Sequence, residues 1–212
     1  MDVGDVAEVY GQVAGRYTAT FFDELDRKPD DRRLLDDVAT ACRGRGPVLD
    51  VGCGPGHVAA YLRRQGVAAV GVDLAAAMAV EGRRRDPAAP FVVADLRRLP
   101  VADGVMAGVV AFYSLIHLPR TALPAAVREL RRTVRPRGVV LLAVHAGVGS
   151  VHADAFLGEP VAVDATLYRA EELAAAAEAA GCAVEQVVER PPYGFEHPTT
   201  RLYVRATVAE AP

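Results

Sequence analysis

Residues 48–56, with the sequence VLDVGCGPG, decide the fold of this chain. A short apolar run leads directly into three glycines at alternate positions, and this pattern predicts a buried parallel strand that turns sharply into a helix. Gly52, Gly54 and Gly56 allow backbone angles and close approaches that a Cβ would prevent. Pro55 is expected in the first turn of the helix, where its missing N–H costs nothing. Because that turn offers unpaired N–H groups and the positive end of the helix dipole, it predicts a site for a nucleotide-like ligand.

The spacing of the glycines narrows the choice of ligand. A pyrophosphate-binding turn has the pattern G-x-G-x-x-G, but here the third glycine comes one residue early and His57 stands in its place. The lysine of a phosphate-binding P-loop is also missing from this stretch. Asp50, before the glycines, does not suit a phosphate and suits a ligand that carries a positive amino group. The turn therefore disfavours a dinucleotide and a nucleoside triphosphate.

Two more acidic residues stand at the ends of predicted strands. The apolar run at residues 67–72 ends at Asp73, which follows Gly54 by 19 residues. This offset is close to the one at which an acid reaches the hydroxyls of a bound ribose. A third strand, predicted at residues 91–94, ends at Asp95.

The glycine turn, Asp73 and Asp95, in this order, resemble the motifs of class I S-adenosylmethionine-dependent methyltransferases. The cofactor of that family has an amino group, a carboxylate, a sulfonium and an adenosine, but no phosphate. The resemblance implies that Asp95 accepts from the adenine amino group. The resemblance covers residues 10–207. After Asp95 it continues through a fourth strand at residues 109–112 and the segment that faces the methyl acceptor at residues 113–119. A helix at residues 122–134, a turn at 135–138 and a fifth strand at 139–144 follow.

Two positions depart from the family pattern. Ala107 stands before the fourth strand where the family usually has an aspartate, and Arg137 replaces the first glycine of a Pro-Gly-Gly turn. Arg137 must adopt a positive φ or change the type of turn.

The resemblance also implies which residues bind the cofactor. Asp50 is expected to contact it, with capping of nearby backbone N–H groups as the alternative role. Met78 is expected against the adenine and Tyr17 over the methionine end, although both could pack in the core, as could Tyr10. The implied cofactor contacts are Tyr17, Asp50, Gly52, Cys53, Gly54, Asp73, Leu74, Met78, Asp95, Leu96 and Phe112.

Two histidines are candidates for catalysis. His117 follows the fourth strand, at the edge of the sheet where open α/β folds bind ligands, and a neutral imidazole there could accept a proton. His145, at the end of the fifth strand, is the second candidate, and a structural role is the alternative for both. Residues that could line the acceptor side, or only pack, are His152, Tyr168, Tyr193, Glu196, His197 and Arg201.

Composition limits the class of protein. The chain has 212 residues, 51% hydrophobic and 24% charged, which fits one domain with a large core. Its net charge of −3 gives no bulk electrostatic case for nucleic-acid binding. Cys42, Cys53 and Cys182 are far apart, so neither a disulfide framework nor a metal site is expected. No signal peptide or membrane span is visible, which favours the cytoplasm.

The order of predicted elements gives an α/β fold. Residues 1–45 are expected to form an N-terminal helical cap in the same domain as the methyltransferase core at residues 46–212. Strands and helices then alternate as in a doubly wound parallel sheet. Residues 147–168 lack a clean period and are placed beside the acceptor pocket, while residues 184–189 and 201–208 are predicted to be two edge strands, one of them antiparallel. The predicted fold is Rossmann-like, with a seven-stranded mixed sheet and helices on both faces.

These observations predict an enzyme that transfers the methyl group of S-adenosylmethionine to a small-molecule acceptor by in-line displacement. In such a reaction the protein mainly aligns and desolvates the two partners. The expected assembly is a monomer or a homodimer. Three alternatives stay open: a non-methylating catalyst or binding protein that uses the same cofactor, a dinucleotide-dependent oxidoreductase, and a methyltransferase that binds RNA or protein through the arginine clusters.

Overall fold

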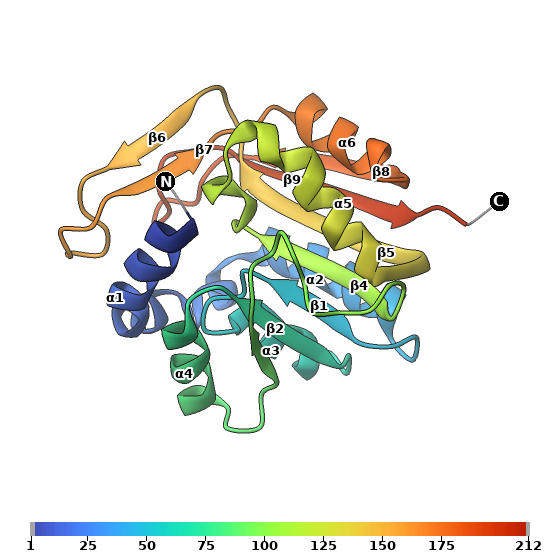
Figure 1. The fold of residues 1–212 in the computed structure, drawn as a ribbon, viewed down its shortest axis with the longest axis horizontal. Coiled ribbons are helices and arrows are strands. Elements are labelled where there is room, and N and C mark those ends of the chain that lie inside the picture. Colours follow the sequence, from blue (N-terminus) through green and yellow to red (C-terminus); the bar gives the residue numbers. More distant parts are fainter. Residues whose placement is uncertain (1–2, 211–212) are drawn as a thin grey trace.

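The computed structural model describes residues 3–210. In it, a seven-stranded sheet has helices on both of its faces (Figure 1). The strands of this sheet are β1 (Val48–Val51), β2 (Ala69–Asp73), β3 (Phe91–Val93), β4 (Met106–Phe112), β5 (Val134–His145), β8 (Cys182–Arg190) and β9 (Arg201–Val208). Their spatial order is β3-β2-β1-β4-β5-β9-β8, with β9 antiparallel to both of its neighbours and the first five strands parallel. The predicted Rossmann-like mixed sheet is confirmed.

Helices precede β1 and connect several of the strands along the chain. The α-helices are α1 (Val3–Phe21), α2 (Pro29–Cys42), α3 (His57–Arg64), α4 (Ala76–Arg85), α5 (Leu123–Thr133) and α6 (Ala170–Ala179). Three short 3₁₀ helices are η1 (Glu24–Arg27), η2 (Leu115–His117) and η3 (Arg120–Ala122). No helix within residues 3–210 is long and apolar enough to cross a lipid bilayer.

The central strands bury both of their faces. On one face, Val109 and Leu142 pack with α5 and α6, and on the other face Val110 and Leu141 pack with α2 and α3. All four side chains are fully buried. Because both faces are covered, β4 and β5 are almost continuous apolar runs and do not alternate with polar residues.

The C-terminal strands differ from the prediction in one respect. Arg201–Val208 was expected at an edge of the sheet, but β9 lies between β5 and β8, and its first four residues are buried. β8 alone forms this edge and exposes Glu185, Gln186 and Val187. The two strands pair with each other as an antiparallel hairpin, so the last strand is inserted inside the sheet.

Residues 147–168 contain a hairpin that the sequence did not predict. β6 (Ser150–Ala153) and β7 (Val163–Thr166) pair as a separate antiparallel sheet of two strands. The strands have four residues each and none of their residues is buried, which explains the missing period. In Figure 1 the hairpin stands beside the N-terminal end of α1.

The two turns that the sequence singled out, at Pro55 and at Arg137, match the prediction only in part. Arg137 adopts a positive φ of 60°, one of the two outcomes expected for it. Pro55 lies in the turn and not in the helix, because α3 begins at His57 with Gly56 as its N-cap. β5 begins at Val134, ahead of this turn, and an irregularity in its pairing with β4 accommodates the extra residues.

The N-terminal segment has two packing roles. α2 joins the layer of helices against the sheet, where its Leu35 and Val38 are fully buried. α1 packs instead on α4, through Ala14 and Met78. In Figure 1 α1 lies between α4 and the β6–β7 hairpin, away from the strands.

A buried ion network joins the N-terminal segment to the last two strands. Arg190 contacts Asp31 and Glu196, at 2.7 Å each, and Lys28 contacts Glu196 at 3.0 Å. These side chains are at most 7% exposed. Burial alone would raise the pKa of Glu196, but hydrogen bonds from Arg190 and Lys28 hold it at about 2.

We expect Glu196→Gln to destabilise the protein by about 3–5 kcal/mol at pH 7, because it leaves buried cations without their partner. The folded-state pKa of Glu196 lies below its unfolded value, so its contribution is present at neutral pH and is lost as the pH falls from about 4.5 towards 2. Urea unfolding at several pH values measures both effects. The exposed Glu185→Gln is the control and should cost less than about 1 kcal/mol.

Candidate active site

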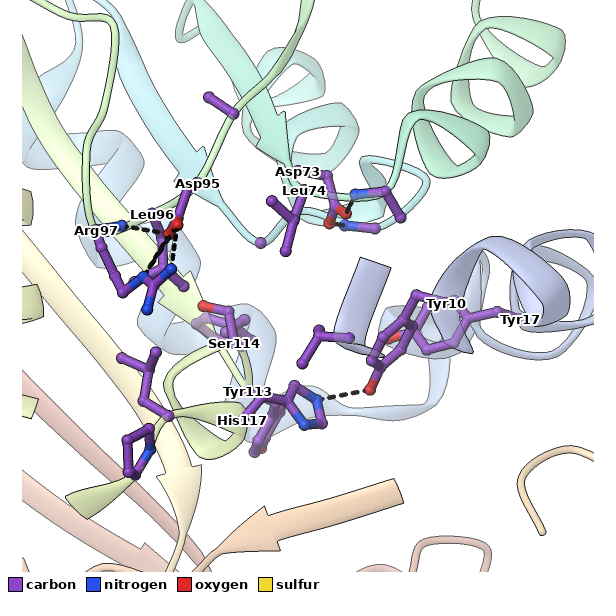
Figure 2. Close-up of a pocket in the computed structure, with 18 residues that line it drawn as sticks. Tyr10, Tyr17, Asp73, Leu74, Asp95, Leu96, Arg97, Tyr113, Ser114 and His117 are labelled. Atoms are coloured by element: carbon purple, nitrogen blue, oxygen red, sulfur yellow. Dashed lines mark hydrogen bonds and ion pairs between the residues drawn. The ribbon is translucent and has the colours of Figure 1, made fainter. Parts of the chain in front are cut away.

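A cavity opens at the carboxyl ends of β1, β2 and β4, the edge at which parallel α/β sheets bind ligands (Figure 2). The loops after β1, β2 and β3 form one wall, and α1 and the segment after β4 form the rest. The lining residues are Val6, Tyr10, Tyr17, Gly52, Gly54, Asp73, Leu74, Ala75, Ala94, Asp95, Leu96, Arg97, Phe112, Tyr113, Ser114, His117, Leu118 and Pro119.

Asp73 holds two loops together at the end of β2. Its Oδ2 accepts a hydrogen bond from the backbone N–H of Gly54 at 2.7 Å, and its Oδ1 accepts one from that of Ala75 at 2.9 Å. Burial raises the pKa of Asp73, and the backbone donors oppose that shift. Because each carboxylate oxygen can accept more than one hydrogen bond, Asp73 can still accept from ligand hydroxyls.

The glycines of the turn need their small size for different reasons. A Cβ on Gly52 would lie 2.1 Å from the Cβ of Ser114, whose Oγ donates to the carbonyl of Val51 at 2.7 Å. A Cβ on Gly54 would point into the cavity, 3.3 Å from Cε1 of Tyr17. Both glycines have positive φ, 67° and 54°. Gly52 thus permits close packing of two loops, and Gly54 keeps space open beside Tyr17.

The second acid of the cavity is paired with a cation. Asp95, after β3, accepts from the Arg97 guanidinium: Nη2 and Nε donate to its Oδ2 at 2.7 and 3.0 Å, and Nε also donates to its Oδ1 at 3.1 Å. Although partial burial opposes it, this pairing lowers the pKa of Asp95. Leu74, Leu96 and the small residues beside them make the walls between the two acids apolar.

His117 lies on η2, across the cavity from Asp73 (Figure 2). Its Nε2 is 2.7 Å from the hydroxyl of Tyr10, and its Nδ1 is 3.0 Å from the carbonyl oxygen of Asp164 on β7. Burial lowers the pKa of His117, so the imidazole is neutral at pH 7. A neutral, hydrogen-bonded imidazole can accept a proton.

Four of the residues expected at the site do not line the cavity. Asp50 lies beneath it, and its Oδ2 accepts from the backbone N–H of Ala59 in the first turn of α3 at 2.9 Å, which is the capping role weighed as the alternative. Cys53 and Met78 are buried in the packing below β2 and between α1 and α4. His145 stacks behind Tyr113, with ring centroids 5.2 Å apart.

The residues weighed for the acceptor side also lie outside the lining. Tyr168 is fully buried beneath η2, with its hydroxyl 3.3 Å from the carbonyl oxygens of Leu115 and Leu118. Glu196 and Arg201 belong to the buried ion network. His152 pairs on the surface with acids of the hairpin, Tyr193 bonds to Asp30, and His197 offers its carbonyl to Arg201.

Sequence reasoning missed part of the site. The sequence leaves Tyr10 ambiguous and favours Tyr17 for the cofactor, although Tyr10 lies two helical turns before Tyr17 and so on the same face of α1. Tyr113, at a positive φ of 55°, and Ser114 were seen only as part of a segment. No local signal in the sequence identified Arg97 as the partner of Asp95.

The residues present fit S-adenosylmethionine. Asp73 offers lone pairs for a ribose diol, Asp95 follows the adjoining strand β3 with apolar walls between the two acids, and the space beside Gly54 is one that a Cβ would fill. None of the described lining residues is a lysine, and Arg97 is already paired, so a phosphate is not favoured.

Comparison with known proteins also indicates a methyltransferase. Residues 48–138 match the family described as methyltransferase domain. Together with the fold, this match supports the class I S-adenosylmethionine-dependent methyltransferase domain that the sequence motifs predict.

Relatives and a solved structure support this assignment. The chain is 34% identical over 138 residues to malonyl-[acyl-carrier protein] O-methyltransferase of Pectobacterium atrosepticum, covering 65% of this chain and 52% of the relative. It is 36% identical over 144 residues to demethylmenaquinone methyltransferase of Beutenbergia cavernae, covering 67% and 58%. A SAM-dependent methyltransferase structure from Methanosarcina mazei superposes with a TM-score of 0.72 at 15% identity, over 80% of this chain and 95% of that one, which supports the fold. The chain spans about half the length of the curated relatives it matches.

We expect Gly54→Val to abolish most cofactor binding, because the new side chain occupies the space beside Tyr17. Gly44→Val is the matched control, since Gly44 has a similar φ of 72° and nothing within 4 Å of its added Cβ. Both variants should lose about 1–2 kcal/mol of stability from the strained backbone. Titration with S-adenosylhomocysteine should show a loss of at least about 30-fold in affinity for Gly54→Val alone; equal affinities would place the cofactor elsewhere.

Asp50→Asn tests the capping role. Burial raises the pKa of Asp50 to about 6, partly opposed by His57, so its charge destabilises the folded state at pH 8. We expect the variant, which keeps an acceptor for Ala59, to be more stable by about 2–3 kcal/mol at pH 8. This difference should shrink as the pH falls through 6 and vanish below about 4, where both forms are neutral. Denaturant unfolding measures it, and a large loss of S-adenosylhomocysteine affinity would instead indicate direct contact with the cofactor.

Proposed function

We propose that this protein transfers the methyl group of S-adenosylmethionine to a small-molecule acceptor. One observation supports the proposal above all: a single cavity has Asp73 and Asp95 on one side and the neutral imidazole of His117 on the other (Figure 2). The first side suits an adenosine, and the second suits a nucleophile that must lose a proton. This arrangement matches the two partners of a methyl transfer.

The proposed roles follow from position. Asp73 binds the ribose hydroxyls, Asp95 the adenine amino group, and the turn at Gly52 and Gly54 admits the cofactor close to the backbone. Leu74, Leu96 and Phe112 supply apolar walls, and Tyr17 covers the methionine end from α1. The cofactor supplies an activated methyl group. The protein aligns the acceptor with it and keeps water out, which accounts for most of the catalysis in such displacements.

The acceptor end of the cavity suits a neutral compound with an apolar body. Its described lining is Val6, Tyr10, Tyr113, Leu118 and Pro119, beside His117. The charged side chains among the lining residues of the described chain are Asp73, Asp95 and Arg97, at the adenosine end. A net charge of −3 also disfavours a nucleic-acid substrate. The three cysteines are free thiols, which favours a reducing compartment such as the cytoplasm.

The direct test measures turnover. The purified chain is incubated with S-adenosylmethionine and a panel of phenols, enols, thiols and amines, and S-adenosylhomocysteine and methylated products are measured by mass spectrometry. Formation of both in equal amounts supports the proposal. Binding of S-adenosylhomocysteine without any methylated product would favour the non-methylating alternative, and thermal stabilisation by NAD in its place would favour an oxidoreductase.

Asp73→Ala should weaken binding of S-adenosylhomocysteine by about 10- to 100-fold, because charge-assisted hydrogen bonds to the ribose are lost. A fall in the melting temperature is also expected, since the N–H groups of Gly54 and Ala75 lose their acceptor. Calorimetric titration and thermal unfolding of one preparation separate the two effects. Asp26→Ala, on the exposed surface of η1, is the control. An unchanged dissociation constant for Asp73→Ala would remove Asp73 from the proposed site.

A further inference from the structure

Tyr10 and His117 form a hydrogen-bonded pair, and the partners of the imidazole indicate which nitrogen carries its proton. The imidazole Nδ1 lies 3.0 Å from the carbonyl oxygen of Asp164. A carbonyl oxygen only accepts hydrogen bonds, so Nδ1 carries the proton of the neutral ring and Nε2 presents its lone pair. The Tyr10 hydroxyl, 2.7 Å from Nε2, therefore donates to it.

Burial keeps both groups in this state. It lowers the pKa of His117, so the ring is neutral, and it raises the pKa of Tyr10, with a smaller contribution from Asp73, so the phenol keeps its proton. Both side chains line the cavity, on the side that faces Asp73 (Figure 2). The pair thus presents a neutral donor and a neutral acceptor to whatever occupies the acceptor end.

The position of α1 holds the Tyr10 hydroxyl in place. Arg16, further along α1, contacts the β6–β7 loop, with its guanidinium 3.1 Å from the carbonyl oxygen of Leu157 and 2.8 Å from the carboxylate of Glu159. The Tyr10 ring packs edge-on against Phe156 of that loop, at 5.9 Å between centroids. Since Nε2 has one lone pair and Tyr10 occupies it, an acceptor could reach Nε2 directly only by displacing the hydroxyl that α1 holds there.

We propose that Tyr10 is a catalytic residue that relays the acceptor's proton to His117, and that the acceptor is a neutral compound with a hydroxyl nucleophile. This inference rests on the proposed function. The acceptor oxygen forms a bond to the methyl carbon as the bond between that carbon and the donor sulfur breaks, and the sulfur keeps the electron pair. The acceptor's proton passes to the Tyr10 oxygen, and the Tyr10 proton passes to Nε2. The products are a methyl ether, a thioether and an imidazolium whose Nδ1–H remains bonded to the carbonyl of Asp164.

The charge balance favours His117 as the final acceptor of the proton. A buried imidazolium is costly by itself, as the lowered pKa of His117 shows. Here the ring gains one positive charge while the methyl donor loses one, so the net charge inside the cavity does not change. The relay also leaves α1 in place, and water stays excluded while the proton moves.

Tyr10→Phe tests the relay, because it removes the hydroxyl and keeps the ring that contacts Tyr17 and Phe156. Tyr193→Phe, which removes a surface hydroxyl bonded to Asp30, is the matched control. With the phenol that wild type methylates fastest, we expect kcat to fall about 10²-fold in Tyr10→Phe, with KM within about threefold. Affinity for S-adenosylhomocysteine and melting temperature should match those of the control.

A second measurement needs no acceptor. Nitrogen NMR of histidine-labelled protein, with His117→Gln to assign the signal, should show the Nδ1–H tautomer at pH 7.5 and a change at Nε2 in Tyr10→Phe alone. An unchanged or higher kcat in Tyr10→Phe would show that His117 takes the proton directly and would overturn the relay, as would an Nε2–H tautomer. Methylation of thiols or amines but of no hydroxyl compound would also overturn it. If wild type methylates nothing, the proposed function fails instead.

Discussion

The carboxylate of Asp73 is the group on which the rest of the site depends. It accepts from the backbone of Gly54 and of Ala75, and so joins the turn after β1 to the start of α4. Three glycines at positive φ cannot hold a turn through their own side chains, so the tie must come from the neighbouring strand. Because the same carboxylate faces the cavity, the group that shapes the glycine turn is also the one available to a ribose.

Contacts beneath the cavity hold Tyr113 in a strained backbone conformation. Tyr113 has a positive φ, which costs about 1–2 kcal/mol for a residue other than glycine. Its hydroxyl is 2.8 Å from that of Tyr203, which donates to Asp31, and its ring stacks on His145. Through Asp31, this contact leads into the buried ion network of α2 and the β8–β9 connection. Residues from both ends of the chain therefore fix one wall of the cavity.

The two ends of the cavity differ in charge, and this division organises the proposed chemistry. Acidic side chains lie at the ends of β2 and β3, while the side near His117 is aromatic and aliphatic. Burial disfavours the charged form of each group and therefore shifts the pKa values of histidine and tyrosine in opposite directions. It lowers the pKa of His117 and, with nearby positive charge, that of His145 to about 3, and it raises the pKa of Tyr10. All three are neutral at physiological pH. Only His117 and Tyr10 line the cavity, so position and not protonation distinguishes them from His145.

The sequence by itself determined the sheet, the glycine turn and the acids at the ends of β2 and β3, since these depend on local strand and turn patterns and on the rule that parallel strands end at one edge. It also identified the class of protein. Only the tertiary structure decided which way the side chains of Asp50, Met78 and His145 point, because a strand or helix residue can face a cavity or the core with the same local sequence. It likewise placed β9 inside the sheet and brought Tyr10 to His117, 107 residues away. Such contacts join elements that pack together to bury apolar surface. The local sequence around each residue does not show which distant element it will pack against.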